Sequence, residues 1–109
     1  MATTARLTHT VALILQAVAC GYRYGFDVMS VTGLPSGTVY PALRRLEEAR
    51  LVRSSWEDER AAHRSQRPAR KNYTITRPGE RALAEAVRRF HHLERALPLA
   101  GDRPRTSGA

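Results

Sequence analysis

The chain has 109 residues, the length of one small domain, and its 18 basic residues outnumber the 10 acidic ones to give a formal net charge of +8. This charge disfavours basic partners and favours a polyanion such as nucleic acid, although a GC-rich genome would also enrich the arginines. The single cysteine, Cys20, excludes a disulfide within the chain, and no apolar run approaches the ~20 residues of a membrane-spanning helix. We therefore expect a soluble cytoplasmic protein, associated with the nucleoid if it binds DNA.

The first predicted helix covers residues 7–22, after a loose arm over residues 1–6. Apolar side chains recur at helical spacing along one face, and Leu13, Ala17 and Cys20 form a second apolar strip. A helix that is apolar on two sides must be covered on two sides. We expect one face to pack in the domain's own core and the other to meet a second subunit.

A short second helix is predicted from Gly25 to about Val31, with Phe26 and Met29 directed inward. Residues 33–35 form a tight turn, and we expect Ser36 to cap a third helix. The buried face of this helix carries Val39, Leu43 and Leu46.

Two helices joined in this way are the arrangement that places the second helix in a DNA groove. Pro41 lies beyond the first turn of the third helix, where a proline removes a backbone hydrogen bond, so we expect an irregular turn there.

Two strands are predicted next, over residues 51–56 and 71–76, joined by a polar and charged segment over residues 57–70. Such a hairpin forms the wing of a winged helix, and we expect its long loop to be mobile at the tip. Trp56, at the end of the first strand, is expected to be structural. Three acidic residues at the base of the loop would repel DNA, so we place them away from the duplex: Glu57, Asp58 and Glu59.

The last predicted helix begins after a Thr76 cap, tolerates Pro78 in its first turn and ends near Pro98. Its apolar residues follow a three-four spacing, which either packs on the domain core or forms a dimer seam. The core already has enough apolar residues, and the first helix has a spare face, so a two-fold dimer is favoured. The predicted dimerisation residues are Leu83, Ala86, Val87, Phe90, Leu93 and Leu97.

Polar and basic residues on the third helix and the wing are the candidates for DNA contact. Hydroxyl groups and guanidinium groups bind base edges and phosphates, whereas an arginine-rich hairpin binds flanking phosphates or the minor groove. An ordinary solvated charged surface is the alternative, since Glu47 and Glu48 partly offset the arginines. The predicted contacts are Ser36, Gly37, Thr38, Tyr40, Arg44 and Arg45 on the helix, and Arg64, Arg67, Arg70 and Lys71 on the wing.

Four motifs follow one another in the order YGFD (24–27), GLPSGTVYPALRRLE (33–47), LVRSSW (51–56) and YTITRPGERAL (73–83). From about Val11 to Leu97 this pattern resembles the PadR family of winged-helix transcriptional regulators. The chain is most similar to the compact branch of the family, which has a single C-terminal dimerisation helix. The resemblance implies dimerisation through that helix and a repressor role, and compact members can bind an aromatic effector between the subunits. The sequence departs from the family at Ala49 and Arg50, where a glycine is usual, and in the longer wing.

We therefore predict an α+β winged helix-turn-helix fold of three helices, a two-stranded wing and one C-terminal helix. Residues 1–78 would form the DNA-binding domain, residues 79–97 the dimerisation helix and residues 98–109 a disordered tail.

The predicted function is a homodimeric repressor that binds an inverted repeat of double-stranded DNA in a promoter, its own included, with an unidentified small-molecule effector. The alternative is a winged-helix module that binds a protein. We expect no enzyme, cofactor, metal or membrane partner, because the four histidines lack metal-ligand spacing and no catalytic motif occurs.

Overall fold

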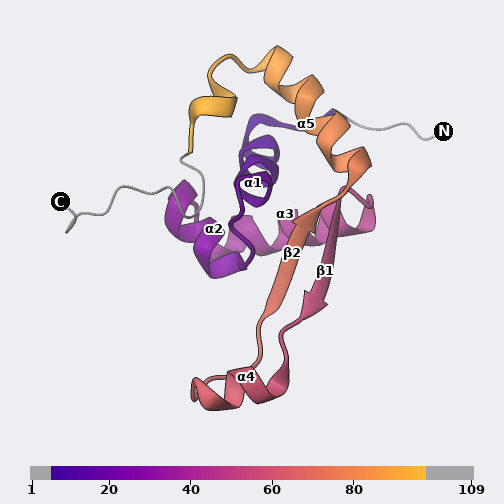
Figure 1. Cartoon of the computed structure of the whole chain (residues 1–109). Helices are drawn as coiled ribbons and strands as arrows, with labels where there is room; N and C mark the ends of the chain where they lie inside the picture. The colour runs from indigo at the N-terminus through magenta and orange to yellow at the C-terminus, as the bar shows by residue number, and fades with distance from the viewer. Residues whose placement is uncertain (1–5, 98–109) are drawn as a thin grey trace.

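The computed structural model describes residues 6–97, so most of the predicted loose arm and the predicted tail over residues 98–109 lie outside the described residues. Helices pack around α1, and a two-stranded hairpin projects away from them with a short helix at its tip (Figure 1). The elements are α1 (His9–Ala19), α2 (Gly25–Thr32), α3 (Ser36–Glu48), β1 (Val52–Trp56), α4 (Glu59–Arg64), β2 (Lys71–Ile75), α5 (Arg77–Arg89) and a 3-10 turn (Leu93–Arg95).

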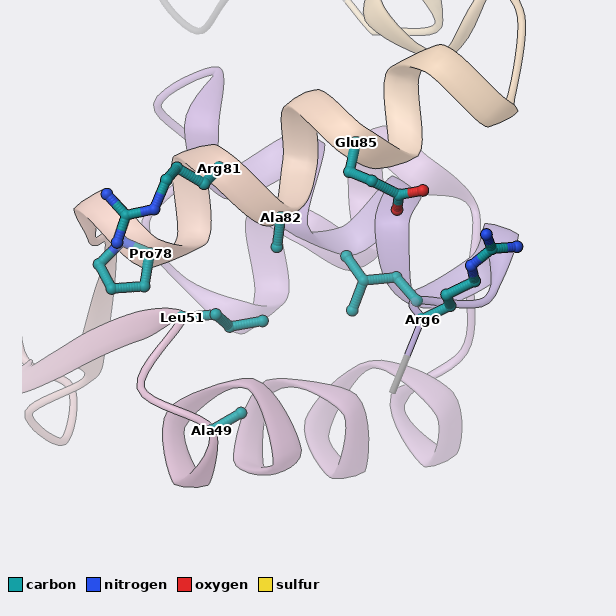
Figure 2. A pocket seen from close by; sticks show the side chains of 8 residues that line it. Arg6, Ala49, Leu51, Pro78, Arg81, Ala82 and Glu85 are labelled. Atoms are coloured by element: carbon teal, nitrogen blue, oxygen red, sulfur yellow. The ribbon is translucent and has the colours of Figure 1, made fainter. Parts of the chain in front are cut away.

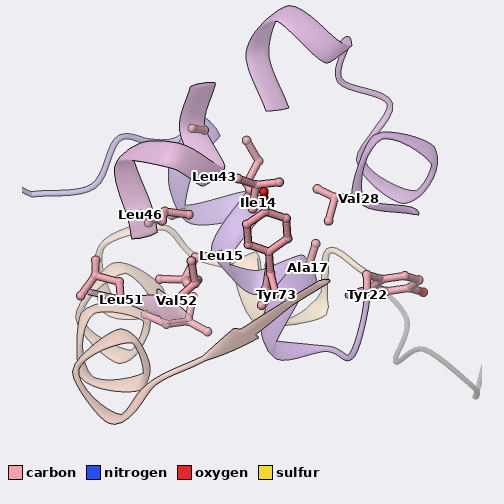
Figure 3. Packing of buried hydrophobic residues seen from close by; sticks show 14 of the residues in the cluster. Ile14, Leu15, Ala17, Tyr22, Val28, Leu43, Leu46, Leu51, Val52 and Tyr73 are labelled. Atoms are coloured by element: carbon pink, nitrogen blue, oxygen red, sulfur yellow. The ribbon is translucent and has the colours of Figure 1, made fainter. Parts of the chain in front are cut away.

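The core forms around α1, which contacts α2, α3, β2 and α5. Side chains from α1, α3 and both strands meet there, with Ile14, Leu15 and Leu43 fully buried (Figure 3). Ala17 and Cys20, from the second apolar strip, are also buried within the chain. The expectation that this strip leaves a free face is therefore wrong for these two residues, because the chain's own elements surround α1.

The turn between α2 and α3 brings the two helices together. Gly33 has a φ of 76°, a left-handed conformation that favours glycine, and its N–H donates to the carbonyl of Met29 at 2.8 Å. Pro35, not Ser36, occupies the cap position of α3, and no side chain caps the helix. The predicted Ser36 cap is wrong because Ser36 is already the first helical residue.

Pro41 does not interrupt α3, which runs continuously to Glu48. The carbonyl of Pro35 accepts from the N–H groups of both Thr38 and Val39 at 3.0 Å. Pro41 has no N–H to donate to the carbonyl of Gly37, yet the helix continues past it.

The C-terminus of α3 ends on an arginine in a left-handed conformation, with Arg50 at a φ of 63°. The N–H of Arg50 donates to Glu47 and that of Leu51 donates to Leu46, both at 2.9 Å. These two bonds form a Schellman motif, in which glycine is the usual residue at the position of Arg50. The replacement of the usual glycine by Arg50 therefore leaves the end of α3 intact. It puts a residue with a side chain into a left-handed conformation that favours glycine.

The wing is longer than a simple hairpin because a helix lies between its strands. The strands pair antiparallel, with Val52 opposite Ile75 and Trp56 opposite Lys71. Asp58 caps α4 by accepting from the N–H of Arg60 at 3.1 Å, and Ala62 is buried. The prediction of an irregular loop over residues 57–70 is therefore wrong in its central part.

The start of α5 follows the prediction. Thr76 accepts from the N–H of Gly79 at 3.0 Å, and Pro78 lies in the first turn. A Cβ at Gly79 would overlap the backbone carbonyl of Leu51, so only glycine lets α5 approach the end of α3 this closely.

The end of α5 corrects the prediction of a helix to Pro98. The helix ends at Arg89, and His92 adopts a φ of 75° that turns the chain back. Leu93 is thereby 1% exposed and joins the core together with Leu83 and Ala86. Three of the six predicted dimerisation residues are thus covered by their own chain, whereas Val87, Phe90 and Leu97 are half-buried.

Candidate nucleic-acid interface

The outer face of α3 carries all six of the residues predicted there for DNA contact. Its inner face buries Val39, Leu43 and Leu46, and this fixes which side of the helix meets solvent. Thr38 is half-buried. The other five residues are exposed: Ser36, Gly37, Tyr40, Arg44 and Arg45.

The cations of α3 are not neutralised within the part of the chain that the structure describes. Neither Arg44 nor Arg45 is within ion-pair distance of any carboxylate there. A Cβ at Gly37 would meet nothing within 4 Å, so this residue leaves open space beside the helix. The outer face of α3 thus presents two free guanidinium groups in its second half and unobstructed backbone at Gly37 in its first turn.

The ring of Tyr40 lies directly on the backbone of Gly25, at the start of α2. A Cβ at Gly25 would overlap the edge of this ring, so the glycine leaves the space that the tyrosine occupies. Tyr40 remains 42% exposed despite this contact. The helix pair therefore holds a phenol at the surface in one orientation.

At the ends of the strands next to α4, two predicted DNA-binding arginines converge on Glu57. Arg67 donates two hydrogen bonds to the carboxylate, at 2.5 and 2.7 Å, and Nε of Arg70 lies 3.7 Å from it. The hydrogen bonds from Arg67 are the main reason that the pKa of Glu57 falls from its ordinary 4.5 to about 2. Glu57 thus faces the hairpin's own arginines and stays ionised.

A second carboxylate connects α3 to the hairpin. Glu47 accepts a hydrogen bond from the hydroxyl of Ser54 at 2.5 Å and lies 3.4 Å from the ammonium of Lys71. The Ser54 hydroxyl is the largest cause of the lowered pKa of Glu47. Three of the four predicted wing contacts therefore have a carboxylate partner, whereas Arg64 is exposed on α4, at the far end of the hairpin (Figure 1).

Two aromatic residues lie at the surface, contrary to prediction. Phe26, expected to point inward, is 66% exposed, and Trp56, expected to be structural, is 68% exposed. The alternation along β1 places Trp56 on the same side as Val52, which is buried. Between Val52 and Trp56 the strand β1 moves away from the helices that cover its start. The alternation of side chains along a strand therefore does not predict at which residue burial ends.

These aromatic residues border a hollow of about 330 Å³ between α2, α3 and the ends of the two strands next to α4. We call it the aromatic slot. Its lining residues are Tyr24, Gly25, Phe26, Tyr40, Trp56, Arg70, Lys71 and Tyr73.

A second hollow lies between α5 and the end of α3, where Arg81, Ala82 and Glu85 face Ala49 and Leu51 (Figure 2). Its carboxylate, Glu85, is already engaged by Arg89, whose Nε donates to it at 3.0 Å. The hollow therefore offers no free set of acid, base and nucleophile.

The single cysteine is buried inside the chain. Burial raises the pKa of the Cys20 thiol, which keeps it protonated, and it accepts from Gln16 at 3.4 Å. Within residues 6–97, no group of three or more metal-binding side chains comes together. None of the helices described there is long and apolar enough to cross a membrane.

The comparisons with known proteins agree with this geometry. The model of the PadR-like family of transcriptional regulators matches residues 14–85, which is more than half of the chain. No curated protein matches the chain.

Three solved structures are similar. A PadR family transcription regulator from Clostridium difficile R20291 has a TM-score of 0.66 at 22% identity, over 81% of this chain and 93% of that one. A PadR-like transcription factor from Bacteroides fragilis has a TM-score of 0.63 at 26% identity, and the match covers 78% of this chain and 82% of that one. A PadR family transcriptional regulator from Eggerthella lenta DSM 2243 has a TM-score of 0.61 at 30% identity, and the match covers 76% of this chain and 72% of that one.

The predicted α+β winged helix-turn-helix fold is thereby confirmed, with α4 as an addition to the wing. The chain belongs to the PadR-like family of transcriptional regulators and is a DNA-binding regulator of transcription.

Proposed function

We propose that this chain is a cytoplasmic, nucleoid-associated repressor that binds an inverted repeat in a promoter, its own included, as a homodimer. The observation that carries the proposal is the outer face of α3, where Arg44 and Arg45 are exposed and have no carboxylate partner among residues 6–97. A guanidinium group binds guanine edges or phosphates in a bidentate way. An uncompensated pair of them on a helix supports sequence-specific binding in the major groove.

The hairpin would contribute contacts of a different kind. Arg64 on α4 and the partly exposed Arg67, Arg70 and Lys71 are suited to phosphates or to the minor groove, which give affinity rather than sequence choice. The ion pair between Glu47 of α3 and Lys71 of β2 connects the hairpin to α3, which supports simultaneous contact of both elements to one duplex.

Dimerisation would place two α3 helices in successive major grooves, about one helical turn apart. The half-buried apolar residues Val87, Phe90 and Leu97 support an interface near the end of α5. An effector bound between the subunits would change the spacing of the α3 helices and release DNA.

Substituting Phe90→Glu tests the dimer by placing a charge in that interface, and Arg88→Glu on the exposed side of α5 is its control. Light scattering should give one chain mass for the first variant and two for the control. A mass of two chains for Phe90→Glu would remove this residue from the interface.

The test of the function is fluorescence anisotropy of the wild-type protein on DNA from upstream of its own gene and on a shuffled duplex, across a salt series. We expect tight binding to the upstream DNA that persists at physiological salt, and weak binding to the shuffled duplex. Equal and steeply salt-dependent binding to both would mean that the net charge of +8 acts alone. The protein-binding alternative would then be favoured.

A further inference from the structure

The large apolar side chains that are exposed within residues 6–97 gather in one place. They are Phe26 on α2, Tyr40 on α3 and Trp56 on β1, and all three line the aromatic slot. Single exposed apolar residues are normal on a protein surface, whereas several from separate elements at one spot indicate a binding site. We therefore interpret the aromatic slot as a binding site.

The walls of the slot are held in place by the contacts behind them. Tyr40 rests on Gly25, and the guanidinium of Arg70 lies over the ring of Tyr24 at 3.8 Å. The ammonium of Lys71 lies 5.8 Å from the centre of the Trp56 ring. The slot thus combines aromatic faces with two cations at its edge.

The two cations have capacity for an anion. Glu57 and Glu47 hold Arg70 and Lys71 at 3.7 and 3.4 Å, yet both basic side chains remain more than a third exposed. Nε of Arg70 is also buried without a hydrogen bond, so a small movement towards an acceptor would satisfy it. A phosphate oxygen at the edge of the slot would bind the exposed parts of these two cations.

The position and size of the slot favour a DNA strand over a protein partner. Tyr40 belongs both to the slot and to the outer face of α3, and Trp56 belongs to the hairpin, so a strand that contacts both elements crosses the slot. A volume of about 330 Å³ lies at the small end of ligand sites, which suits one nucleotide unit rather than a helix. The cations match the charge of the DNA backbone.

We propose that the aromatic slot binds one sugar–phosphate unit of the DNA backbone. Tyr40 and Trp56 would pack against the deoxyribose, while Arg70 and Lys71 would contact its phosphates. This proposal rests on the proposed function, since it needs a DNA strand between α3 and the hairpin. It adds Trp56 to the residues proposed to contact DNA, and a contact to the sugar–phosphate backbone carries no sequence information.

Trp56 is the only tryptophan in the chain, so its fluorescence reports on the slot alone. The experiment measures acrylamide quenching of Trp56 in the full chain, free and saturated with a duplex from its upstream DNA, with saturation followed by anisotropy of a label on the duplex. We expect the quenching constant to fall at least about twofold on binding, because a covered indole is shielded from the quencher.

Failure of the slot proposal can be distinguished from failure of the proposed function. A duplex that binds, as its anisotropy shows, while Trp56 stays as accessible as in the free protein would overturn the slot proposal and leave the proposed function standing. No binding to any duplex would overturn both, and protection of Trp56 by a second protein instead of DNA would favour the protein-binding alternative.

Two variants test the slot without relying on fluorescence. Trp56→Ala should weaken binding to the upstream and shuffled duplexes alike by roughly five- to tenfold, the lower part of the range for an aromatic contact to a nucleotide, and Trp56→Phe should restore most of the loss. Because Trp56 is mostly exposed, both variants should keep the wild-type circular dichroism spectrum. Unchanged affinity of Trp56→Ala would overturn the proposal.

Gly25→Ala addresses the wall of the slot. Its methyl group would displace the far end of the Tyr40 ring, which can swing outward, so the fold should persist. We expect the affinity of this variant for both duplexes to fall as well. Wild-type affinity in a variant of confirmed fold would contradict the role given to the orientation of Tyr40.

Discussion

The two basic regions of the molecule, the outer face of α3 and the part of the hairpin next to α4, hold their charges in different ways. Arg44 and Arg45 on α3 have no carboxylate partner within residues 6–97, whereas Arg67, Arg70 and Lys71 are each paired with Glu57 or Glu47. The free pair gives up no existing ion pair when a base or phosphate approaches. The paired cations are already oriented, and part of their charge is offset.

This difference separates two tasks that the sequence presents as one run of basic residues. Free guanidinium groups on a helix can select among base edges, and their loss changes which sequence is bound. The paired cations of the hairpin add contacts to phosphates, which are the same for every sequence, and the pair between Lys71 and Glu47 joins the hairpin to α3. We therefore expect α3 to determine specificity and the hairpin to determine general affinity.

The largest effect on function is expected from Arg44→Ala. Loss of a free guanidinium should weaken binding to the matching DNA by about 1–3 kcal/mol in an anisotropy titration. Arg81→Ala on α5 removes the same charge elsewhere and is the matched control, which should stay within about twofold of wild type if only net charge is lost. An equal loss of affinity in Arg44→Ala and Arg81→Ala would show that only net charge matters, and would contradict a special role for the free arginines of α3.

A smaller effect, on stability and its pH dependence, is expected from Glu57→Gln. The folded pKa of Glu57, about 2, lies below its ordinary 4.5, so the carboxylate stabilises the fold above the ordinary value. That contribution is lost progressively as the pH falls from about 4.5 towards 2. Thermal unfolding at pH 7 and pH 3 should show a smaller difference in Tm for Glu57→Gln than for wild type. An unchanged difference would show that the ion pair does not order the hairpin.

The smallest effect is expected at the end of α3, where Arg50→Gly tests the backbone rather than the charge. Glycine relieves the left-handed conformation at a φ of 63°, which should stabilise the fold by about 1 kcal/mol in a urea titration. Arg50→Ala removes the charge but keeps the strain, so it should give no gain. If alanine stabilises as much as glycine, the strain is not the cause.

Sequence patterns predicted the parts of this fold that rest on local signals. The Thr76 cap, the extents of the two strands and the buried face of α3 depend on neighbouring residues, and each is present. The residues of α3 proposed for DNA contact were found in the same way, because burial of Val39 and Leu43 leaves the other face outside.

The errors arose where contacts distant in sequence decide the outcome. The three-four spacing after Leu83 is compatible with one long helix, yet the chain turns at His92 and buries Leu93 in its own core. Complete burial of a leucine contributes roughly 1.5–3 kcal/mol, which is enough to compete with two further helical turns. The exposure of Phe26 and Trp56 likewise depends on where the hairpin leaves the helices, and periodicity does not encode that point.

The central claim is that α3 determines specificity and the hairpin does not. The most direct measurement is the ratio of affinities for the matching and the shuffled duplex in two variants: Arg44→Ala, and the double variant Glu57→Gln with Arg67→Gln, which removes the ion pair without changing the net charge. We predict that the ratio falls in Arg44→Ala and is retained in the double variant, whose affinity drops on both duplexes. A retained ratio in Arg44→Ala, or a lost ratio in the double variant, would contradict the claim.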